Sequence, residues 1–354
     1  MGRRLKIGIY SPYLDTLGGG EKYIFDIAVC LSSEHDVYVF WDDKLIASKA
    51  EKRFSLKLDK VNFTSNVFKK KNTLKTLLVS REFDVIFYLS DGSMPLLLSK
   101  KNFVIFQFPI NWVKVNSLLK LKLSRIDKLI CYSDFVKKSL VSKLKKDTLV
   151  IPPFTDLKKD TKIKKENIIL TVGRFTKGMN MKKQEVLIDV FKKMCDGGLK
   201  SWKLVVAGSY RKEDYDFFND LVDQSDKYPI EVLGNISYSE LLIYYNKAKI
   251  YWHATGFKED LEKNPERAEH FGITTVEAMR CGAVPVVINA GGQMEIVKNN
   301  VSGFLWNTLD ELKSQTAALI KNQTIMKKIS KEAEKDSLRF NKEEFCNSIN
   351  TLIS

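Results

Sequence analysis

Two glutamates, Glu269 and Glu277, lie in a segment whose residue types can bind hydroxyls and phosphate. A loop that ends in Glu269 meets a helix predicted to start near Thr274, and Glu277 falls in the opening turns of that helix. Gly282 and Pro285 then mark the passage into a following strand. The two carboxylates can accept hydrogen bonds from sugar and ribose hydroxyls, and the backbone amides between them can receive phosphate oxygens. This short segment can therefore contact all three parts of a nucleotide sugar.

Two cationic residues follow a predicted strand earlier in the second half of the chain. The strand 167–172 runs into Gly173-Arg174, and after a lysine-rich loop Lys182 lies at the start of a helix. Open α/β sheets bind ligands at the carboxyl ends of their strands, so Arg174 and Lys182 can clamp a diphosphate there without a metal ion. The alternative is that both are solvated surface charges.

Three consecutive glycines, Gly18 to Gly20, follow the first predicted strand, and a helix is predicted to begin at about Lys22. Glycines at such a junction let the backbone approach a ligand closely, and the helix start supplies free N–H groups for phosphate. The spacing differs from the G-x-G-x-x-G pattern, which argues against a nicotinamide cofactor. The alternative is a tight turn that needs a positive φ at Gly19 or Gly20.

The histidines and one acidic segment are further candidates. Among the three histidines, we expect His270 beside Glu269 to be a site residue, whereas His35 and His253 are expected to pack or to face solvent. The segment 256–268 contains four acidic residues and is predicted to be an extended loop. It can act as a lid or bind a metal ion, or it can be a solvated acidic loop.

Both halves of the chain alternate short runs rich in Val and Ile with segments of helical period, which is typical of parallel sheets covered by helices. In the first half the predicted strands are 6–10, 36–40, 84–89, 103–108, 128–132 and 148–151. In the second half they are 167–172, 202–207, 230–233, 249–253 and 284–288. The recurrence predicts two similar α/β domains that face a cleft.

A proline-marked and strongly charged stretch separates the two halves. Pro152 and Pro153 precede the charged segment 158–165, which suits a linker and places the boundary near residue 160. The tail from residue 309 has helical period with many Lys and Glu. We therefore predict domains at 1–160 and 161–335, followed by a C-terminal helix at 336–354 that packs back on the first domain.

Length, charge and cysteine content narrow the class of protein. A chain of 354 residues is too long for one ordinary core and suits two domains. The net charge of +15 favours an anionic partner, although no nucleic-acid-binding module is recognisable. No apolar run approaches the roughly 20 residues that a membrane helix needs. The five cysteines have no paired spacing, which predicts a reducing compartment, a cytoplasmic location and no metal site.

The segment 112–146 mixes Leu, Val and Trp with ten Lys and Arg residues. Basic residues beside apolar ones suit a peripheral enzyme on an anionic membrane, here at the cytoplasmic face. The alternative is the solvated surface of a lysine-rich protein.

Glu269 and Glu277, with seven residues between them, match the motif of the family 4 retaining glycosyltransferases, and the chain resembles that family over most of its length. The resemblance is strongest from 167 to 306 and implies the GT-B fold, in which two Rossmann-like domains with parallel sheets face an interdomain cleft. Other matches occur in the family's order: Gly-Gly-Gly-Glu at 18–21, Gly-Arg-Phe at 173–175, Lys-Lys-Gln at 182–184, Ala-Gly-Ser at 207–209, Leu-Gly-Asn at 233–235 and Gly-Gly-Gln-Met-Glu-Ile-Val at 291–297.

The resemblance also implies a role for each matching residue. Arg174 and Lys182, with Lys183 as the alternative, hold the donor's phosphates, and Glu269 holds sugar hydroxyls. Glu277 holds the ribose. The remaining donor-binding residues are Gly19 and Gly20 from the first domain, Leu233 and Asn235 beside the base, and His270, Phe271, Gly272 and Ile273 at the phosphate site.

The implied activity is transfer of a sugar, expected to be a hexose, from a nucleotide diphosphate sugar to a hydroxyl of a glycan, lipid-linked or other acceptor, with retention of configuration and no cofactor. Relatives that act on lipid-linked acceptors commonly have a His where this chain has Gln107, between Phe106 and Phe108. Glutamine can orient an acceptor hydroxyl but cannot take its proton. The alternative function is therefore a catalytically silent scaffold that binds nucleotide sugars or membrane lipids.

Overall fold

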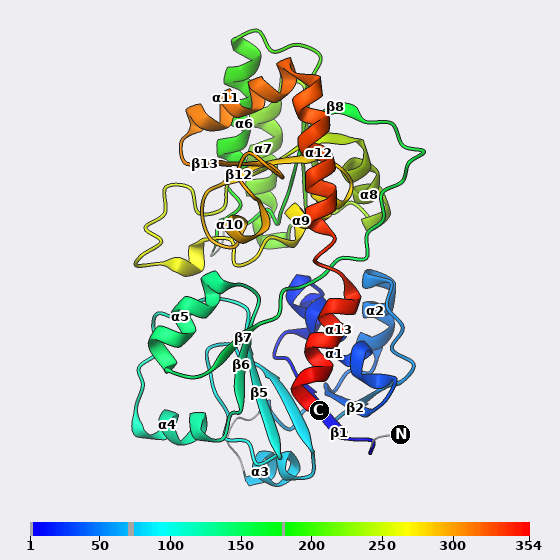
Figure 1. The fold of residues 1–354 in the computed structure, drawn as a ribbon, viewed down its shortest axis with the longest axis vertical. Coiled ribbons are helices and arrows are strands. Elements are labelled where there is room, and N and C mark those ends of the chain that lie inside the picture. Colours follow the sequence, from blue (N-terminus) through cyan, green and yellow to red (C-terminus); the bar gives the residue numbers. More distant parts are fainter. Residues whose placement is uncertain (1–2, 70–73, 179–180) are drawn as a thin grey trace. The chain divides into compact units, whose positions relative to one another are not determined.

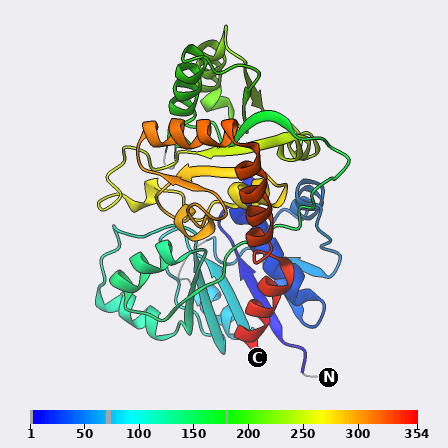
Figure 2. The same ribbon diagram turned by 45° about the horizontal axis from the view of Figure 1, so that its top comes forward.

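The structure is a computed structural model that describes residues 3–69, 74–178 and 181–354. The chain forms two compact units, one made of Met1–Pro153 with Lys342–Ser354 and the other of Phe154–Asn341. Figures 1 and 2 show a sheet with packed helices in each unit. Both sheets are parallel, so the predicted α/β class with two Rossmann-like domains is confirmed.

The sheet of the first unit has seven parallel strands in the order β3-β2-β1-β4-β5-β6-β7. The chain runs outward from β1 to β2 and β3 and then returns beside β1 as β4, so the strand order reverses between β1 and β4. In doubly wound sheets this reversal is where ligands bind, outside the carboxyl ends of the strands. The strands are β1 Lys6–Tyr10, β2 Asp36–Phe40, β3 Val61–Thr64, β4 Val85–Leu89, β5 Lys101–Phe106, β6 Lys128–Cys131 and β7 Thr148–Val150.

Helices pack against both faces of such a sheet, and this explains the continuous apolar runs in its central strands. All five residues of β4, for example, are buried. Capping side chains mark some of the helix starts: Asn116 and Ser133 each accept a backbone hydrogen bond from the turn that follows them. The helices are α1 Gly19–Ser32, α2 Leu45–Phe54, α3 Leu74–Arg81, α4 Ser117–Ser124, α5 Asp134–Leu144 and α13 Lys342–Ile353.

The sheet of the second unit has six parallel strands in the order β10-β9-β8-β11-β12-β13. Its order reverses between β8 and β11, which corresponds to the reversal in the first unit. Its strands are β8 Glu166–Val172, β9 Lys203–Gly208, β10 Ile230–Gly234, β11 Ala248–His253, β12 Val284–Ile288 and β13 Phe304–Trp306. Its helices are α6 Gln184–Asp196, α7 Tyr215–Ser225, α8 Tyr238–Lys247, α9 Ile273–Arg280, α10 Gln293–Ile296, α11 Leu309–Lys321 and α12 Gln323–Ser337.

The terminal helix α13 belongs to the first unit, where it packs against α1. A disulfide joins Cys30 of α1 to Cys346 of α13, with 5.3 Å between their Cα atoms. The ring of Phe345 also meets Tyr23 edge-on, with 5.1 Å between the centroids. This disulfide differs from the sequence-based expectation of a reducing compartment, in which disulfides are rare. The two residues lie 316 positions apart, so only the folded chain brings them together.

The chain enters and leaves the second unit at neighbouring points. Thr155 N donates to Phe340 O at 3.3 Å. The guanidinium of Arg280 on α9 donates to the carbonyls of Thr155, Ser337 and Phe340 at 3.4, 3.3 and 3.2 Å. Phe154 is buried at this start, so the second unit begins before the expected boundary near 160.

Candidate functional site

The candidate site of the second unit lies at the carboxyl edge of its sheet, where the strand order reverses. Lys182 follows β8, His253 is the last residue of the neighbouring strand β11, and Glu269 comes after that strand. Lys182 Nζ lies 2.7 Å from Glu269 Oε2, and His253 Nε2 lies 2.8 Å from the same oxygen. The side chain of Glu269 is only 13% exposed, so this carboxylate is held by two partners in a largely buried position.

The charge states of this group follow from its surroundings. Burial alone would raise the pKa of Glu269, but the Lys182 ammonium and the hydrogen bond with His253 outweigh it and hold the pKa well below its usual range. Burial lowers the pKa of His253 in spite of the carboxylate beside it. A neutral imidazole fits this contact when it donates its Nε2 proton to Glu269. At neutral pH the group therefore pairs one cation with one anion and one neutral donor.

Sequence reasoning missed His253, which we expected to pack or to face solvent. It is 3% exposed, but its ring contacts the candidate sugar-binding carboxylate. The available signal was its place as the last residue of a strand beside the reversal of strand order. In the sequence alone, a histidine at the end of a strand cannot be told from a core residue, because the strand order that places it at the site is not known.

Lys183 is directed to a different carboxylate from Lys182. Its Nζ lies 2.7 Å from Glu259 Oε1, and Arg267 donates to the other oxygen of Glu259 at 2.8 Å. The Arg267 and Lys183 hydrogen bonds hold the pKa of Glu259 below its usual value. The acidic segment 256–268 is therefore tied to the start of α6 through Glu259, whose side chain is 9% exposed.

Arg174 lies at the same edge but is not joined to the Lys182–Glu269 pair. Its side chain is exposed and makes no ion pair with any residue that the structure describes, and its carbonyl accepts a hydrogen bond from Gln184 at 3.0 Å. The preceding residue, Gly173, has no room for a Cβ, which would lie 2.6 Å from Lys182 Cγ. This glycine lets the Lys182 side chain cross the end of β8.

Glu277 lies on α9 and is held by a buried tyrosine. Tyr245 on α8 donates its hydroxyl to Glu277 Oε2 at 2.8 Å, and its own side chain is fully buried. Burial and the Glu277 carboxylate both raise the pKa of Tyr245 well above its usual value, so the hydroxyl keeps its proton and remains a donor. Sequence reasoning did not identify Tyr245, because an aromatic residue in a helix usually indicates core packing.

The backbone between the two glutamates is shaped by glycines. Gly272 caps α9 with a φ of +114°, a conformation that side chains rarely adopt. Gly292 N donates to Glu269 O at 2.8 Å, and a Cβ on Gly292 would lie 2.5 Å from the Cα of Phe271. The turn at 291–293 can therefore lie directly against the segment 269–272.

The remaining donor-side candidates of the second unit have partners of their own. His270 Nε2 contacts Glu266 O at 3.0 Å, and burial lowers the pKa of His270. Asn235 holds the backbone of Tyr210 through both side-chain atoms, at 3.0 and 3.2 Å. Leu233 is half-buried at the end of β10, and Ile273 is half-buried at the start of α9.

The candidates of the first unit form a separate, uncharged group. Any Cβ on Gly20 would collide with the side-chain amide of Gln107, so the glycine makes room for this residue. Gly19 and Gly20 lie in the first turn of α1 without positive φ, so the tight-turn alternative for these two glycines is wrong. Gln107 Nε2 is buried and has no hydrogen-bond partner among the described residues. The structure thus brings Gly20 and Gln107 together.

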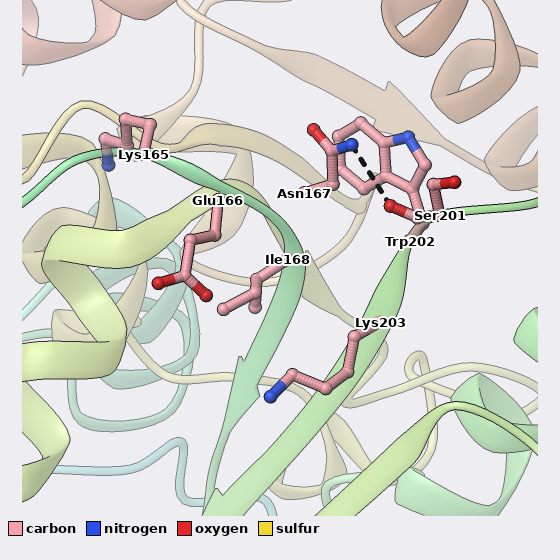
Figure 3. A pocket seen from close by; sticks show the side chains of 7 residues that line it. All are labelled: Lys165, Glu166, Asn167, Ile168, Ser201, Trp202 and Lys203. Carbon is pink, nitrogen blue, oxygen red and sulfur yellow. Dashed lines mark hydrogen bonds between the residues drawn. The ribbon is translucent and has the colours of Figure 1, made fainter.

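A shallow cavity of about 480 Å³ lies at the opposite edge of the second sheet, at the amino ends of β8 and β9 (Figure 3). Its polar groups already bond to neighbouring backbone and side chains: Asn167 donates to Ser201 O at 3.0 Å, Lys165 donates to Ala248 O at 2.6 Å, and Lys203 pairs with Glu231 at 2.8 Å. Burial lowers the pKa of Lys165 to about 8. These contacts stabilise the strand starts, and the candidate residues above lie at the other edge.

A metal site would need clustered ligands, and a membrane span would need a long apolar helix. Within 3–69, 74–178 and 181–354, no group of three or more His, Cys, Asp or Glu side chains is arranged to hold a metal ion. In the same ranges no helix is long and apolar enough to cross a membrane. Metal-independent activity stays a prediction.

Residues 154–336, just over half of the chain, match the family model for glycosyl transferases group 1. The chain belongs to this glycosyltransferase family. The matched segment contains all the candidate residues of the second unit, from Arg174 to Glu277. The sequence is also 27% identical over 238 residues to an uncharacterized glycosyltransferase of Methanocaldococcus jannaschii, which covers 66% of this chain. This chain spans only 61% of that relative's length.

Solved structures show the same fold for this group 1 glycosyltransferase. A glycosyltransferase from Rickettsia africae superposes with a TM-score of 0.78 at 19% identity, covering 99% of this chain and 98% of that one. The Anabaena protein HepE, solved in complex with UDP-glucose, superposes with a TM-score of 0.69 at 18% identity, covering 98% and 99%. At these identities the likeness concerns the fold alone.

Proposed function

We propose that this protein is a retaining glycosyltransferase of family 4 that moves a hexose from a nucleotide diphosphate sugar to an acceptor hydroxyl. The observation that carries the proposal is the pair of supported carboxylates at the carboxyl edge of the second sheet. Glu269 is held by Lys182 and His253, and Glu277 by Tyr245, within the segment that matches the family model. Two fixed acceptors on either side of a helix start suit a ligand that carries hydroxyls at both ends and phosphate between them.

The proposed donor site assigns a part of the ligand to each residue. Glu269 receives sugar hydroxyls and Glu277 receives the ribose, while the amides of residues 271 to 273 and the cations Arg174 and Lys182 face the phosphates. Lys182 already neutralises Glu269 at 2.7 Å, so a bound diphosphate competes with that carboxylate for the ammonium. The complex of HepE with UDP-glucose supports a nucleotide-sugar donor for this fold.

In the proposed reaction the bond between the anomeric carbon and the diphosphate oxygen breaks. The acceptor oxygen then bonds to that carbon on the same face, and the acceptor's proton leaves with the diphosphate. Catalysis depends on stabilising the negative charge of the departing group. One well-placed charged donor typically contributes a few kcal/mol to such stabilisation. Arg174 and Lys182 take this role, and no metal ion is needed in the proposal.

The acceptor is proposed to be a hydroxyl on a glycan or on a lipid-linked molecule, placed near Gln107 in the first unit. The buried Nε2 of Gln107 makes no hydrogen bond of normal geometry with the described residues, and the Tyr132 hydroxyl lies beside the Gln107 amide. An amide can orient a hydroxyl, but it cannot accept a proton in the transition state. The same residue keeps the silent-scaffold alternative open. A cytoplasmic location stays a prediction, which the Cys30–Cys346 disulfide does not favour.

The decisive experiment combines binding with turnover. Nucleotide diphosphate sugars are first screened for thermal stabilisation, because a ligand that binds only the folded state raises stability with its concentration. The stabilising donors are then tested for sugar transfer and for slow hydrolysis. Transfer or hydrolysis that falls by roughly a hundredfold in Lys182→Ala supports the enzyme. Donor binding without either reaction, on any acceptor tested, supports the scaffold.

A further inference from the structure

Large apolar side chains are exposed on one helical layer of the first unit. The helices α3, α4 and α5 contribute to one core cluster, for example through Leu123 of α4 and Leu140 of α5. On the outer side of this layer, α4 and the residues just before it remain open to solvent. Their exposed apolar residues are Trp112 at 52%, Val115 at 39%, Leu118 at 58% and Leu121 at 55%. We call these four residues the α4 patch.

The composition of α4 explains why the patch exists. Leu119 and Leu123 face the core, and Leu123 is 7% exposed. Leu118 and Leu121 are three positions apart, so they share the other side of the helix. A surface helix of a soluble domain normally has polar residues on that side. Large exposed apolar side chains gathered on one side of a helix in this way indicate an interaction site.

The charge around the patch is strongly positive. The segment 112–146 contains ten Lys and Arg residues but only Asp127 and Asp134 as acids. Lys114, Lys120 and Lys138 are exposed and make no ion pair in the part of the chain that the structure describes. Lys122, on the same helix as the leucines, has its pKa lowered by burial. The surface therefore offers apolar side chains and cations together.

We propose that the α4 patch docks on an anionic lipid bilayer. Leu118 and Leu121 enter the boundary between headgroups and acyl chains, Trp112 lies at the headgroup level, and the lysines contact lipid phosphates. A bilayer supplies hydrocarbon and phosphate without a fixed pattern of hydrogen bonds, and this suits a patch of leucines and flexible lysines. Each basic residue near an anionic surface strengthens such binding.

The patch adjoins the acceptor-side residue of the first unit. The rings of Phe108 and Trp112 stack with 5.8 Å between their centroids, and Phe108 directly follows Gln107. Docking through Trp112 would therefore hold the segment after β5, which contains Gln107, close to the lipid surface. Only this last step, access to a lipid-borne acceptor, depends on the proposed function. Docking itself goes beyond the transfer reaction and is tested without it.

The test is flotation of the purified full chain with vesicles. Vesicles of phosphatidylcholine alone are compared with vesicles of phosphatidylcholine and phosphatidylglycerol in equal amounts. We expect binding to the anionic vesicles only, weakened by high salt. The double variant Leu118→Ser with Leu121→Ser should bind at least about tenfold more weakly. The triple variant Lys114→Gln, Lys120→Gln and Lys138→Gln should bind about a hundredfold more weakly.

Matched controls come from the second unit. Val301→Ser with Ile325→Ser removes two apolar residues that are 50% and 46% exposed, and Lys327→Gln, Lys328→Gln and Lys331→Gln removes three exposed lysines of α12. Both controls should bind like the unmodified chain, and circular dichroism should show all variants folded. Absent wild-type binding, or equal losses in the controls, overturns the proposal. So does a leucine variant that changes only self-association in sedimentation, because a second copy then covers the patch.

Discussion

The two units place different side chains at the same topological position. In each sheet the strand order reverses beside the first strand, and the candidate residues follow the carboxyl ends near that point. The second unit concentrates ionised groups there, with Lys182 and Glu269 paired at 2.7 Å. The first unit instead places the uncharged amide of Gln107 against Gly20.

This difference leads us to expect that the second unit handles the donor and the first unit handles the acceptor. Fixed charges can stabilise charge that develops on a departing diphosphate, whereas a neutral amide can only orient a hydroxyl. We therefore expect substitutions in the second unit to change donor binding and turnover. Substitutions in the first unit should change the use of the acceptor. The following predictions test this contrast, in order of decreasing expected effect.

Removing either cation of the clamp should give the largest loss. We expect Lys182→Ala and Arg174→Ala each to lower kcat/KM for transfer by roughly a hundredfold, the scale for one lost charge-stabilising contact. The control is Lys177→Ala, since Lys177 is exposed, pairs with Asp220 at 3.3 Å and lies over the ring of Phe217 at 5.3 Å. Steady-state kinetics measure the effect. Wild-type rates in both variants would show that these cations do not clamp the donor.

Substitutions of the two glutamates should have different effects on turnover and on nucleotide binding. Glu269→Gln should mainly lower turnover, and it should reduce the enzyme's discrimination among donors that carry different sugars on the same nucleotide. Its affinity for the bare nucleotide diphosphate should change little. Glu277→Gln should weaken the bare nucleotide diphosphate and the full donor alike, by ~1–3 kcal/mol, because a charged acceptor for ribose hydroxyls is lost. Calorimetry with both ligands separates the two. Equal losses for the bare nucleotide would refute the division between sugar and ribose.

Tyr245 should act only through Glu277. We expect Tyr245→Phe to weaken nucleotide diphosphate binding by about 1 kcal/mol, because the carboxylate loses the hydroxyl that fixes it. The adjacent Tyr244 provides a matched control, since it donates to Glu231 at 2.8 Å and Glu231 is not a candidate site residue. Tyr244→Phe should leave nucleotide affinity unchanged. A similar loss of nucleotide affinity in both variants would mean that the substitutions destabilise α8 as a whole and do not act through Glu277.

Substitution of Gln107 should have a smaller and more selective effect. We expect Gln107→Ala to lower transfer to the acceptor by no more than about fivefold, the scale for one neutral hydrogen bond. Donor affinity and donor hydrolysis should not change. Comparing transfer with hydrolysis in the same preparation measures this split. A parallel fall in donor affinity would contradict the assignment of acceptor chemistry to the first unit.

Excess chelator should have no effect on transfer. The proposed clamp stabilises the diphosphate with Arg174, Lys182 and backbone amides in place of a divalent ion. Assays with and without a chelator check this directly. If activity is lost and magnesium or manganese restores it, the reaction needs a divalent ion, and the acidic segment 256–268 becomes the candidate metal site.

Much of the fold could be predicted because parallel strands buried on both faces produce apolar runs. β4 and β12 are such runs, and both were found from sequence. β3 and β13 were missed because Val61–Thr64 and Phe304–Trp306 are short and lie at sheet edges, where half-buried residues break the pattern. The Cys30–Cys346 disulfide could not be predicted, because sequence spacing carries no signal for a pair so far apart.

The candidate site shows the same limit at the level of single residues. Glu269 and Glu277 were identified because their spacing forms a motif. His253 and Tyr245, which hold them, lie elsewhere in the sequence and look like core residues. The pairing of Lys183 with Glu259 was likewise invisible, because it depends on how the segment 256–268 folds back onto α6. Sequence identifies groups that recur in a motif, whereas the fold identifies the groups that support them.

The backbone hydrogen bond between Thr155 and Phe340 joins the beginning and the end of the second unit. The unit is one uninterrupted stretch of sequence, Phe154–Asn341, and its two ends are closed on each other by this bond and by Arg280. Such a stretch can be cut out as a single gene fragment and exchanged between relatives without a long gap at the junctions. The first unit is the opposite case. It requires both ends of the chain, so a truncated chain that stops before Lys342 lacks α13.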